Sequence, residues 1–186
     1  EFAVLNLYAL AGDDRFVNLA HYASYLGLAV VSSALAKLQG GSHLVQLLAA
    51  TFSITLPQAI LGASGTKNDL TVAFWIAVAV YFSSRCAVTF RSSDAVCLGL
   101  AAALSIHTKA TAYVWLPLPL LAPWLAACKP SLRHLLKAFV ALTLAVVSVN
   151  LGHYVRNLRT FSQPLGCTSA HCEANLKFAS AEFSLP

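Results

Sequence analysis

The sequence predicts an all-α protein, a polytopic bundle of transmembrane helices. Apolar residues make up 58% of the 186 residues and charged residues only 10%, whereas a soluble domain carries about 25% charged residues. The mean hydropathy is +0.70. The apolar residues form five long runs, one of them interrupted, and at least four are long enough to span a bilayer. Such runs are typical of helices that satisfy their own backbone hydrogen bonds in lipid, and not of alternating barrel strands.

The five apolar runs predict the helices in chain order. They cover residues 16–38, 44–63, 70–84, 95–127 and 135–153. Asp13 and Asp14, followed by Arg15, precede the first run and are expected to cap its helix. Asn68 and Asp69 are expected to cap the third helix, because an acidic group also favours a helix N-terminus.

The fourth run is interrupted by His107-Thr108-Lys109. The 12 residues before His107 would cover about 18 Å as a helix, against a hydrocarbon core of about 30 Å. We therefore expect a re-entrant or short helical hairpin around Lys109. One kinked helix is the alternative, although the prolines at 117, 119 and 123 favour an interruption. Lys109 then either snorkels to the interface from a helix end or meets an anionic ligand in a polar pocket.

The charge distribution predicts the orientation and the domains. If the spans alternate, one face collects one acidic residue, Asp94, and six basic residues: Lys37, Arg85, Arg91, Lys129, Arg133 and Lys137. The other face collects six basic and six acidic residues. Because basic loops stay in the cytoplasm, residues 64–69 and the Lys109 turn are expected on the periplasmic or luminal face of an inner, plasma or endoplasmic-reticulum-type membrane. Residues 1–153 would form the transmembrane bundle and residues 154–186 a periplasmic or luminal loop or tail. Four aromatic residues near run ends are interpreted as interfacial belts: Tyr113, Trp115, Trp124 and Tyr154.

Composition also indicates which kinds of binding partner to expect. The basic charge is dispersed over the membrane loops and forms no stripe interleaved with aromatics, so nucleic acid is not an expected partner, whereas membrane lipids are. The sequence contains no cofactor motif, and binding of a divalent metal stays an alternative. It predicts no oligomeric state. The chain has no methionine and opens without a signal segment, so we expect it to be a piece of a longer protein.

Polar residues gather on the predicted external face. Lys67, Asn68 and Asp69 share a tight loop on the same face as Lys109. A carboxylate and two lysines around a polar pocket are suited to hold a phosphate while orienting a hydroxyl or a sugar. Helix capping alone is the alternative explanation for Asp69.

The residues after 153 add two further candidates. Arg156 and Arg159 fall on one helix face, where their forked donors suit a phosphate or anchor the chain to lipid headgroups. Cys167 and Cys172 would form a disulfide in an oxidising compartment or stay as free thiols. A metal pair completed by His171 is the least favoured reading, because two further ligands are not in sight.

Four segments resemble one family in the same order. They are GDDRFVNLAHY, PQAILGASGTKNDLTVAFWIAVAVYF, ALSIHTKATAY and HYVRNLRTFSQPLG. The chain resembles the hydrophobic half of a GT-C glycosyltransferase, the class of protein mannosyltransferases and lipid-A aminoarabinose transferases, in the branch described as RgtA/B/C/D-like. It departs from that pattern at four positions, namely Gly65 for serine, Lys67 for glutamine, Ala110 for glycine and Ser162 for glycine.

The resemblance implies transfer of a sugar from a polyprenyl-phosphate-linked donor to an acceptor on the periplasmic or luminal side. For the donor phosphate the resemblance implies Lys109 and Arg156. Lys67, where the family often has glutamine, is a third candidate because of its charge beside Asp69. For the cavity or the substrate the resemblance implies Asn68, Asp69 and Asn157. His107 and Tyr154 are further candidates for the same cavity. The catalytic acid is expected upstream of Glu1, so no catalytic residue is assigned and this piece alone is expected to be inactive.

Two other classes of function stay open. A secondary transporter also uses broken helices with charged residues at the break. The sequence shows no internal inverted repeat and no second broken helix to match the one at Lys109, which counts against that class. A non-catalytic multi-pass membrane protein is the third class.

Overall fold

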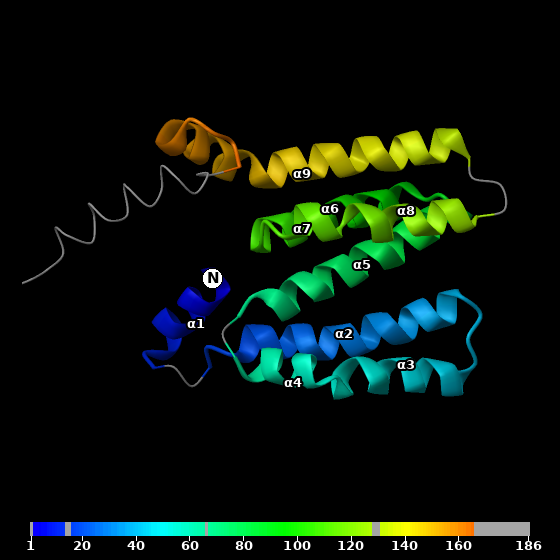
Figure 1. Ribbon diagram of the computed structural model, residues 1–186, viewed down its shortest axis with the longest axis horizontal. Coiled ribbons are helices and arrows are strands. Elements are labelled where there is room, and N and C mark those ends of the chain that lie inside the picture. Colours follow the sequence, from blue (N-terminus) through cyan, green and yellow to red (C-terminus); the bar gives the residue numbers. More distant parts are fainter. Residues whose placement is uncertain (1, 14–15, 66, 128–130, 166–186) are drawn as a thin grey trace, which may run out of the picture. The chain divides into compact units, whose positions relative to one another are not determined.

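The computed structural model describes residues 2–13, 16–65, 67–127 and 131–165 (Figure 1). This part of the chain is helical and contains no strand, which confirms the predicted all-α class. The helices are α1 (Phe2–Ala11), α2 (Leu19–Leu38), α3 (His43–Thr55), α4 (Pro57–Ser64), α5 (Asp69–Val88), α6 (Ser92–Thr108), α7 (Ala112–Trp115), α8 (Pro117–Ala126) and α9 (Leu132–Phe161). The chain forms two compact units, Glu1–Val149 and Asn150–Pro186.

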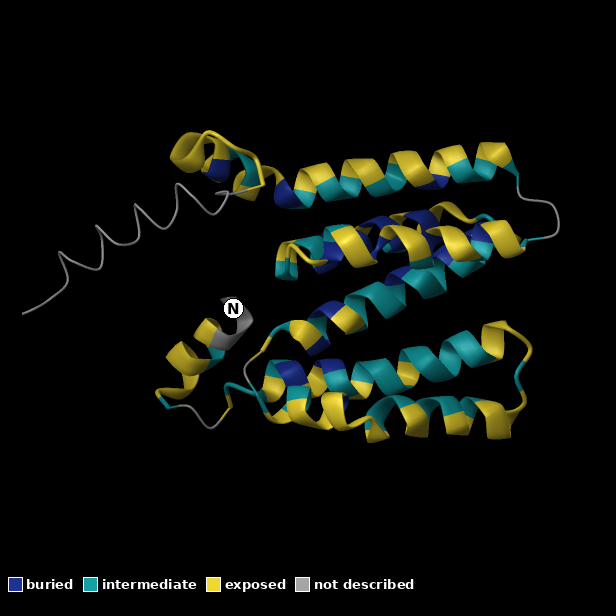
Figure 2. Ribbon diagram, viewed as in Figure 1, coloured by how far each residue is buried: buried dark blue, intermediate teal, exposed yellow. Residues whose placement is uncertain are grey.

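Three of the described helices are long and apolar enough to cross a membrane. They are α2, α5 and α9, and the bent pair of α3 and α4 counts as a fourth if it forms one span. Large apolar residues of these helices are also exposed, for example Leu48 on α3 and Leu144 on α9. Figure 2 shows much of the surface of α3 and α9 as exposed. Outward apolar faces of this kind suit a lipid surrounding.

The run at 44–63 forms two helices instead of one. Pro57 has no amide hydrogen and its ring clashes with the preceding turn, so α3 ends at Thr55 and α4 starts at Pro57. The two helix axes differ by 58°. The Tyr25 hydroxyl of α2 donates to the carbonyl of Ile54 at 2.8 Å, which satisfies a backbone group beside the break. The second broken helix that the sequence analysis did not find is therefore present.

The predicted hairpin around Lys109 is confirmed. Helix α6 ends at Thr108, Lys109 follows in an extended conformation, and the chain returns through α7 and α8. Helix α6 starts three residues before the apolar run, so its 17 residues span about 26 Å. The hairpin arm is thus longer than the predicted 18 Å.

Small residues bring the helices of the first unit close together. A side chain at Gly99 of α6 would lie 2.8 Å from the Ala141 carbonyl oxygen and 2.9 Å from Ala145 Cβ, both on α9. On α2, Gly27 receives the ring of Phe74 from α5. Such contacts are how helices pack in lipid, where no hydrophobic force drives them together.

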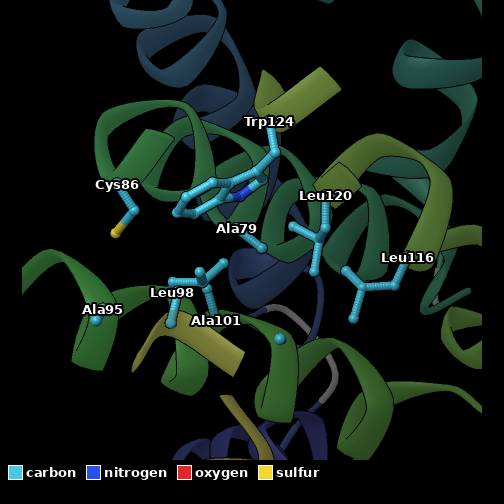
Figure 3. Close-up of a cluster of buried hydrophobic side chains, with 10 residues drawn as sticks. Ala79, Cys86, Ala95, Leu98, Ala101, Leu116, Leu120 and Trp124 are labelled. Atoms are coloured by element: carbon cyan, nitrogen blue, oxygen red, sulfur yellow. The ribbon is translucent and has the colours of Figure 1, made fainter. Parts of the chain in front are cut away.

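The core of the first unit includes Trp124, which packs with Ala79, Leu98 and Leu120 (Figure 3). Its indole Nε1 donates to Ser83 Oγ of α5 at 3.0 Å, and that hydroxyl donates to the carbonyl of Leu120 at 2.7 Å. Trp124 is buried, so its interpretation as an interfacial belt residue is wrong, whereas Trp115 is exposed. The position near a run end did not reveal that this side of α8 packs on α5.

We expect Ser83→Ala to lower the free energy of unfolding by about 0.6 to 1.7 kcal/mol, because both interhelical bonds are lost. Ser148→Ala is the matched control: the Ser148 hydroxyl is exposed and bonds only within α9, to Leu144. Detergent-driven unfolding in mixed micelles measures both variants. Equal effects of the two substitutions would contradict a bridging role for Ser83.

Three sequence expectations differ at the helix ends. Helix α1 lies where the sequence analysis placed no element. Asn18, and not Asp13, precedes α2 at the N-cap position, and its side chain makes no capping hydrogen bond; Asp14 and Arg15 lie outside the described residues. Helix α9 continues to Phe161, so the expected boundary at 153/154 falls inside it.

Candidate functional site

The candidate site lies where two helix ends of the first unit meet. The Lys109 ammonium at the end of α6 forms an ion pair with Oδ1 of Asp69, the first residue of α5. The two residues are 40 positions apart in the sequence. Their side chains are 41% and 52% exposed, so water and a ligand have access to both. The prediction that Asp69 and Lys109 share one face is confirmed.

Local structure explains how each partner is positioned. The amide of Lys109 donates to the Ser105 carbonyl at 3.1 Å, and the Lys109 carbonyl accepts from Ala112 at 3.0 Å. These bonds close the α6 helix and start the next one, so the lysine stands at a tight turn. Asp69 occupies the first turn of α5, where a carboxylate is favoured by the helix dipole.

The loop before α5 carries two further predicted residues. Lys67 is exposed beside Asp69, and Asn68 takes the N-cap position of α5. Asn68 makes no side-chain capping bond, so the predicted capping contact is absent. The loop is attached to α2 because Asn18 Nδ2 donates to the Ser64 carbonyl at 3.2 Å.

A buried polar cluster next to this loop escaped the sequence analysis. His21 is 2% exposed, and its Nδ1 lies 3.2 Å from Thr71 Oγ1 of α5. Ser24 Oγ lies 3.2 Å from the same Thr71 oxygen. Polar side chains inside apolar helices join neighbouring helices, so this cluster fixes α2 against the start of α5, two residues after Asp69. The i, i+3 spacing of His21 and Ser24 on one helix face was the available signal.

The opposite end of the α5–α6 hairpin holds a second ion pair. Arg85 Nε lies 3.1 Å from Asp94 Oδ2, and Asp94 is buried. The Arg85 guanidinium also lies 5.8 Å from the centroid of the Tyr81 ring. The two ion pairs lie at opposite ends of the same two helices, which agrees with the predicted alternation of the loops.

An apolar cavity of about 380 Å³ opens in the first unit between α6, α7, α8 and α9. Ile106 and Tyr113, which flank Lys109 in sequence, line one part of it, and Leu135 and Val147 bound its extent along α9. Leu135 and Val147 are twelve positions apart on α9, which corresponds to a length of about 18 Å along the helix. The lining contains few polar groups, among them Thr143 and Ser83. The cavity therefore suits an elongated apolar ligand.

The predicted residues on the last part of α9 belong to the second unit. Arg156 Nη2 lies 3.3 Å from His153 Nδ1, and Asn157 Nδ2 lies 3.1 Å from His153 Nε2. Asn157 is buried and also donates to the Pro164 carbonyl at 3.2 Å. Arg156 is exposed and Tyr154 half-buried. His153 is thus the partner that organises this group, and the sequence analysis did not assign it a role.

Of the remaining predicted residues, only His107 lies in the part of the chain that the structure describes. His107 is exposed in the last turn of α6. The possible disulfide between Cys167 and Cys172, with His171, lies outside the described residues. Among the residues that are described, no three or more His, Cys, Asp or Glu side chains form a group that could hold a metal ion.

The chain was compared with family models, curated proteins and solved structures, and none of the three comparisons returned a match. The resemblance to GT-C glycosyltransferases therefore stays a prediction from the four sequence segments.

Proposed function

We propose that this chain is part of a membrane glycosyltransferase that moves a sugar from a polyprenyl-phosphate-linked donor to an acceptor on the periplasmic or luminal side. The observation that carries the proposal is the pairing of Lys109 with Asp69, at a turn whose neighbours Ile106 and Tyr113 line an apolar cavity. The four segments that resemble GT-C enzymes support the same assignment.

The charges suit a phosphate. The Lys109 ammonium has three donor hydrogens, and Asp69 takes one of them. Lys67 and Lys109 together outweigh Asp69 by one positive charge. In the transfer, the bond between the sugar C1 and the phosphate oxygen breaks and its electron pair stays on the phosphate. The acceptor hydroxyl oxygen bonds to C1 and gives up its proton to a base. No residue of this chain is assigned as that base. Lys109 would stabilise the negative charge that develops on the leaving phosphate.

The cavity suits the donor's tail. Its lining is almost entirely apolar. Ile106 and Tyr113, which lie before and after the Lys109 turn in the sequence, are part of that lining. An isoprenoid chain in this cavity would leave its phosphate beside the Lys109 turn. The resemblance assigns Arg156 and Asn157 to phosphate or sugar binding, and Tyr154 is a candidate next to them; all three belong to the second unit. His107, in the last turn of α6, is a further candidate in the first unit.

A transfer assay tests the proposal. The full-length protein is incubated in vesicles with a panel of radiolabelled polyprenyl-phosphate sugars, and transfer of label from the donor lipid to a product is measured. We expect label to leave at least one donor only when the protein is present. Failure to consume any donor of the panel, with acceptor-rich membrane extract supplied, would overturn the proposal.

One observation favours a second candidate, a secondary transporter. The break between α3 and α4 adds a second interrupted helix, and transporters place substrates at such breaks. The same vesicles distinguish the two classes, because a transporter would accumulate a solute without consuming a lipid-linked sugar.

A further inference from the structure

A basic cluster lies at the end of the first unit away from Lys109. Arg91 is exposed at the N-cap of α6, directly after Phe90. The His134 ring of α9 stacks on Phe90 with ring centroids 5.1 Å apart, and the Lys137 ammonium lies 5.6 Å from the Phe90 centroid. Phe90 thus brings Arg91 to the first two turns of α9, which also carry exposed Arg133.

Among the described residues, no carboxylate forms an ion pair with Arg91, Arg133 or Lys137. Asp94 is the only acidic residue between positions 70 and 172 in the sequence. It is buried and already paired with Arg85 at 3.1 Å. Asp69 is paired with Lys109 at the other end of α5. Helix α9 itself contains no acidic residue.

The cluster is electrostatically unfavourable without an external anion. Arg133 and Lys137 are four residues apart on α9, where like charges repel. Arg133 also lies in the first turn of the helix, where its dipole disfavours positive charge. An anion bound between Arg133, Lys137 and Arg91 would relieve both effects.

The surroundings identify the anion as part of a lipid. Large apolar side chains next to the cluster on α9 face outward, with Leu136 56% and Phe139 62% exposed. A free phosphate would leave this apolar surface uncovered. A phospholipid places its phosphate on the cations and its acyl chains along the adjoining apolar face.

We propose that Arg91, Arg133, His134 and Lys137 form a binding site for the phosphate group of an anionic phospholipid, whose acyl chains lie along Leu136 and Phe139. The site joins the α5–α6 connection to the start of α9. Its basic residues lie at the other end of the first unit from the Lys109–Asp69 pair, and Phe139 also lines the apolar cavity proposed for the donor tail. Lipid retention is measured without sugar transfer, so the test below does not depend on the proposed transferase activity.

Native mass spectrometry of the full-length protein, titrated with phosphatidylglycerol and with phosphatidylcholine of the same acyl chains, tests this site. We expect the wild type to retain phosphatidylglycerol preferentially. The preference should fall about fivefold for each basic residue removed, hence about 25-fold in Arg133→Gln/Lys137→Gln. Lys37→Gln is the matched control, because Lys37 lies at the end of α2, outside the cluster, and is predicted on the same membrane face. This variant should keep the preference.

The charge-conserving variant Arg133→Lys/Lys137→Arg guards against a folding defect and should also keep the preference. An unchanged preference in Arg133→Gln/Lys137→Gln would overturn the proposal. So would an equal loss in Lys37→Gln, which would indicate a general surface-charge effect. Equally tight binding of soluble glycerophosphate would show that the site does not require a lipid and would overturn it as well.

Discussion

Lys109→Ala is expected to reduce sugar transfer by the full-length protein about 100- to 1000-fold, the usual effect of removing one group that stabilises developing charge. The lysine stands at the tip of the α6–α7 hairpin, between Ile106 and Tyr113, which line the cavity, and its side chain is 41% exposed. Without it, the leaving phosphate would have no cation from this turn. Initial rates with a radiolabelled polyprenyl-phosphate sugar, at several donor concentrations, measure the loss.

The same variant should fold normally. The ion pair with Asp69 is about half exposed, and such pairs contribute only about 0.2 to 1 kcal/mol to stability. Lys109→Arg keeps the charge and should recover part of the rate. Lys37→Ala removes a lysine far from the site and should transfer at the wild-type rate. Wild-type turnover by Lys109→Ala would remove this residue from the mechanism.

Gly99→Ala is expected to have the largest effect on stability, lowering the free energy of unfolding by about 1 to 3 kcal/mol. The added methyl group would meet the Ala141 carbonyl oxygen at 2.8 Å, and backbone atoms of α9 cannot move aside as a flexible side chain can. The helices α6 and α9 would have to separate, which weakens every contact between them.

Gly152→Ala is the control for this prediction, because a Cβ at Gly152 has no neighbour within 4 Å. Alanine is the better helix former, so this variant should be neutral or more stable by up to about 1 kcal/mol. Unfolding in mixed detergent micelles compares the two variants. A stabilising effect of Gly99→Ala would show that α6 and α9 are not in close contact in the folded protein.

Much of the site could be anticipated from the sequence, but not its contacts. Alternation of the apolar runs placed Asp69 and Lys109 on one face, because consecutive helices return the chain to the same end. The alternation does not say which loops touch. The rotation of each helix decides that, and it brought Asp69 to Lys109 and His21 to Thr71. The same rotation buried Trp124, which its position near a run end had suggested to be interfacial.

The sequence by itself determined the helical class, the number of apolar runs and the interruption at Lys109. Each of these follows from local properties, since an apolar run in lipid must satisfy its backbone hydrogen bonds within its own helix, and a charged turn cannot continue it. Only the tertiary structure decided the 58° bend between α3 and α4, the Lys109–Asp69 pair and the approach of α9 to Gly99. These features depend on residues tens of positions apart, whose meeting is set by how small side chains let neighbouring helices pack.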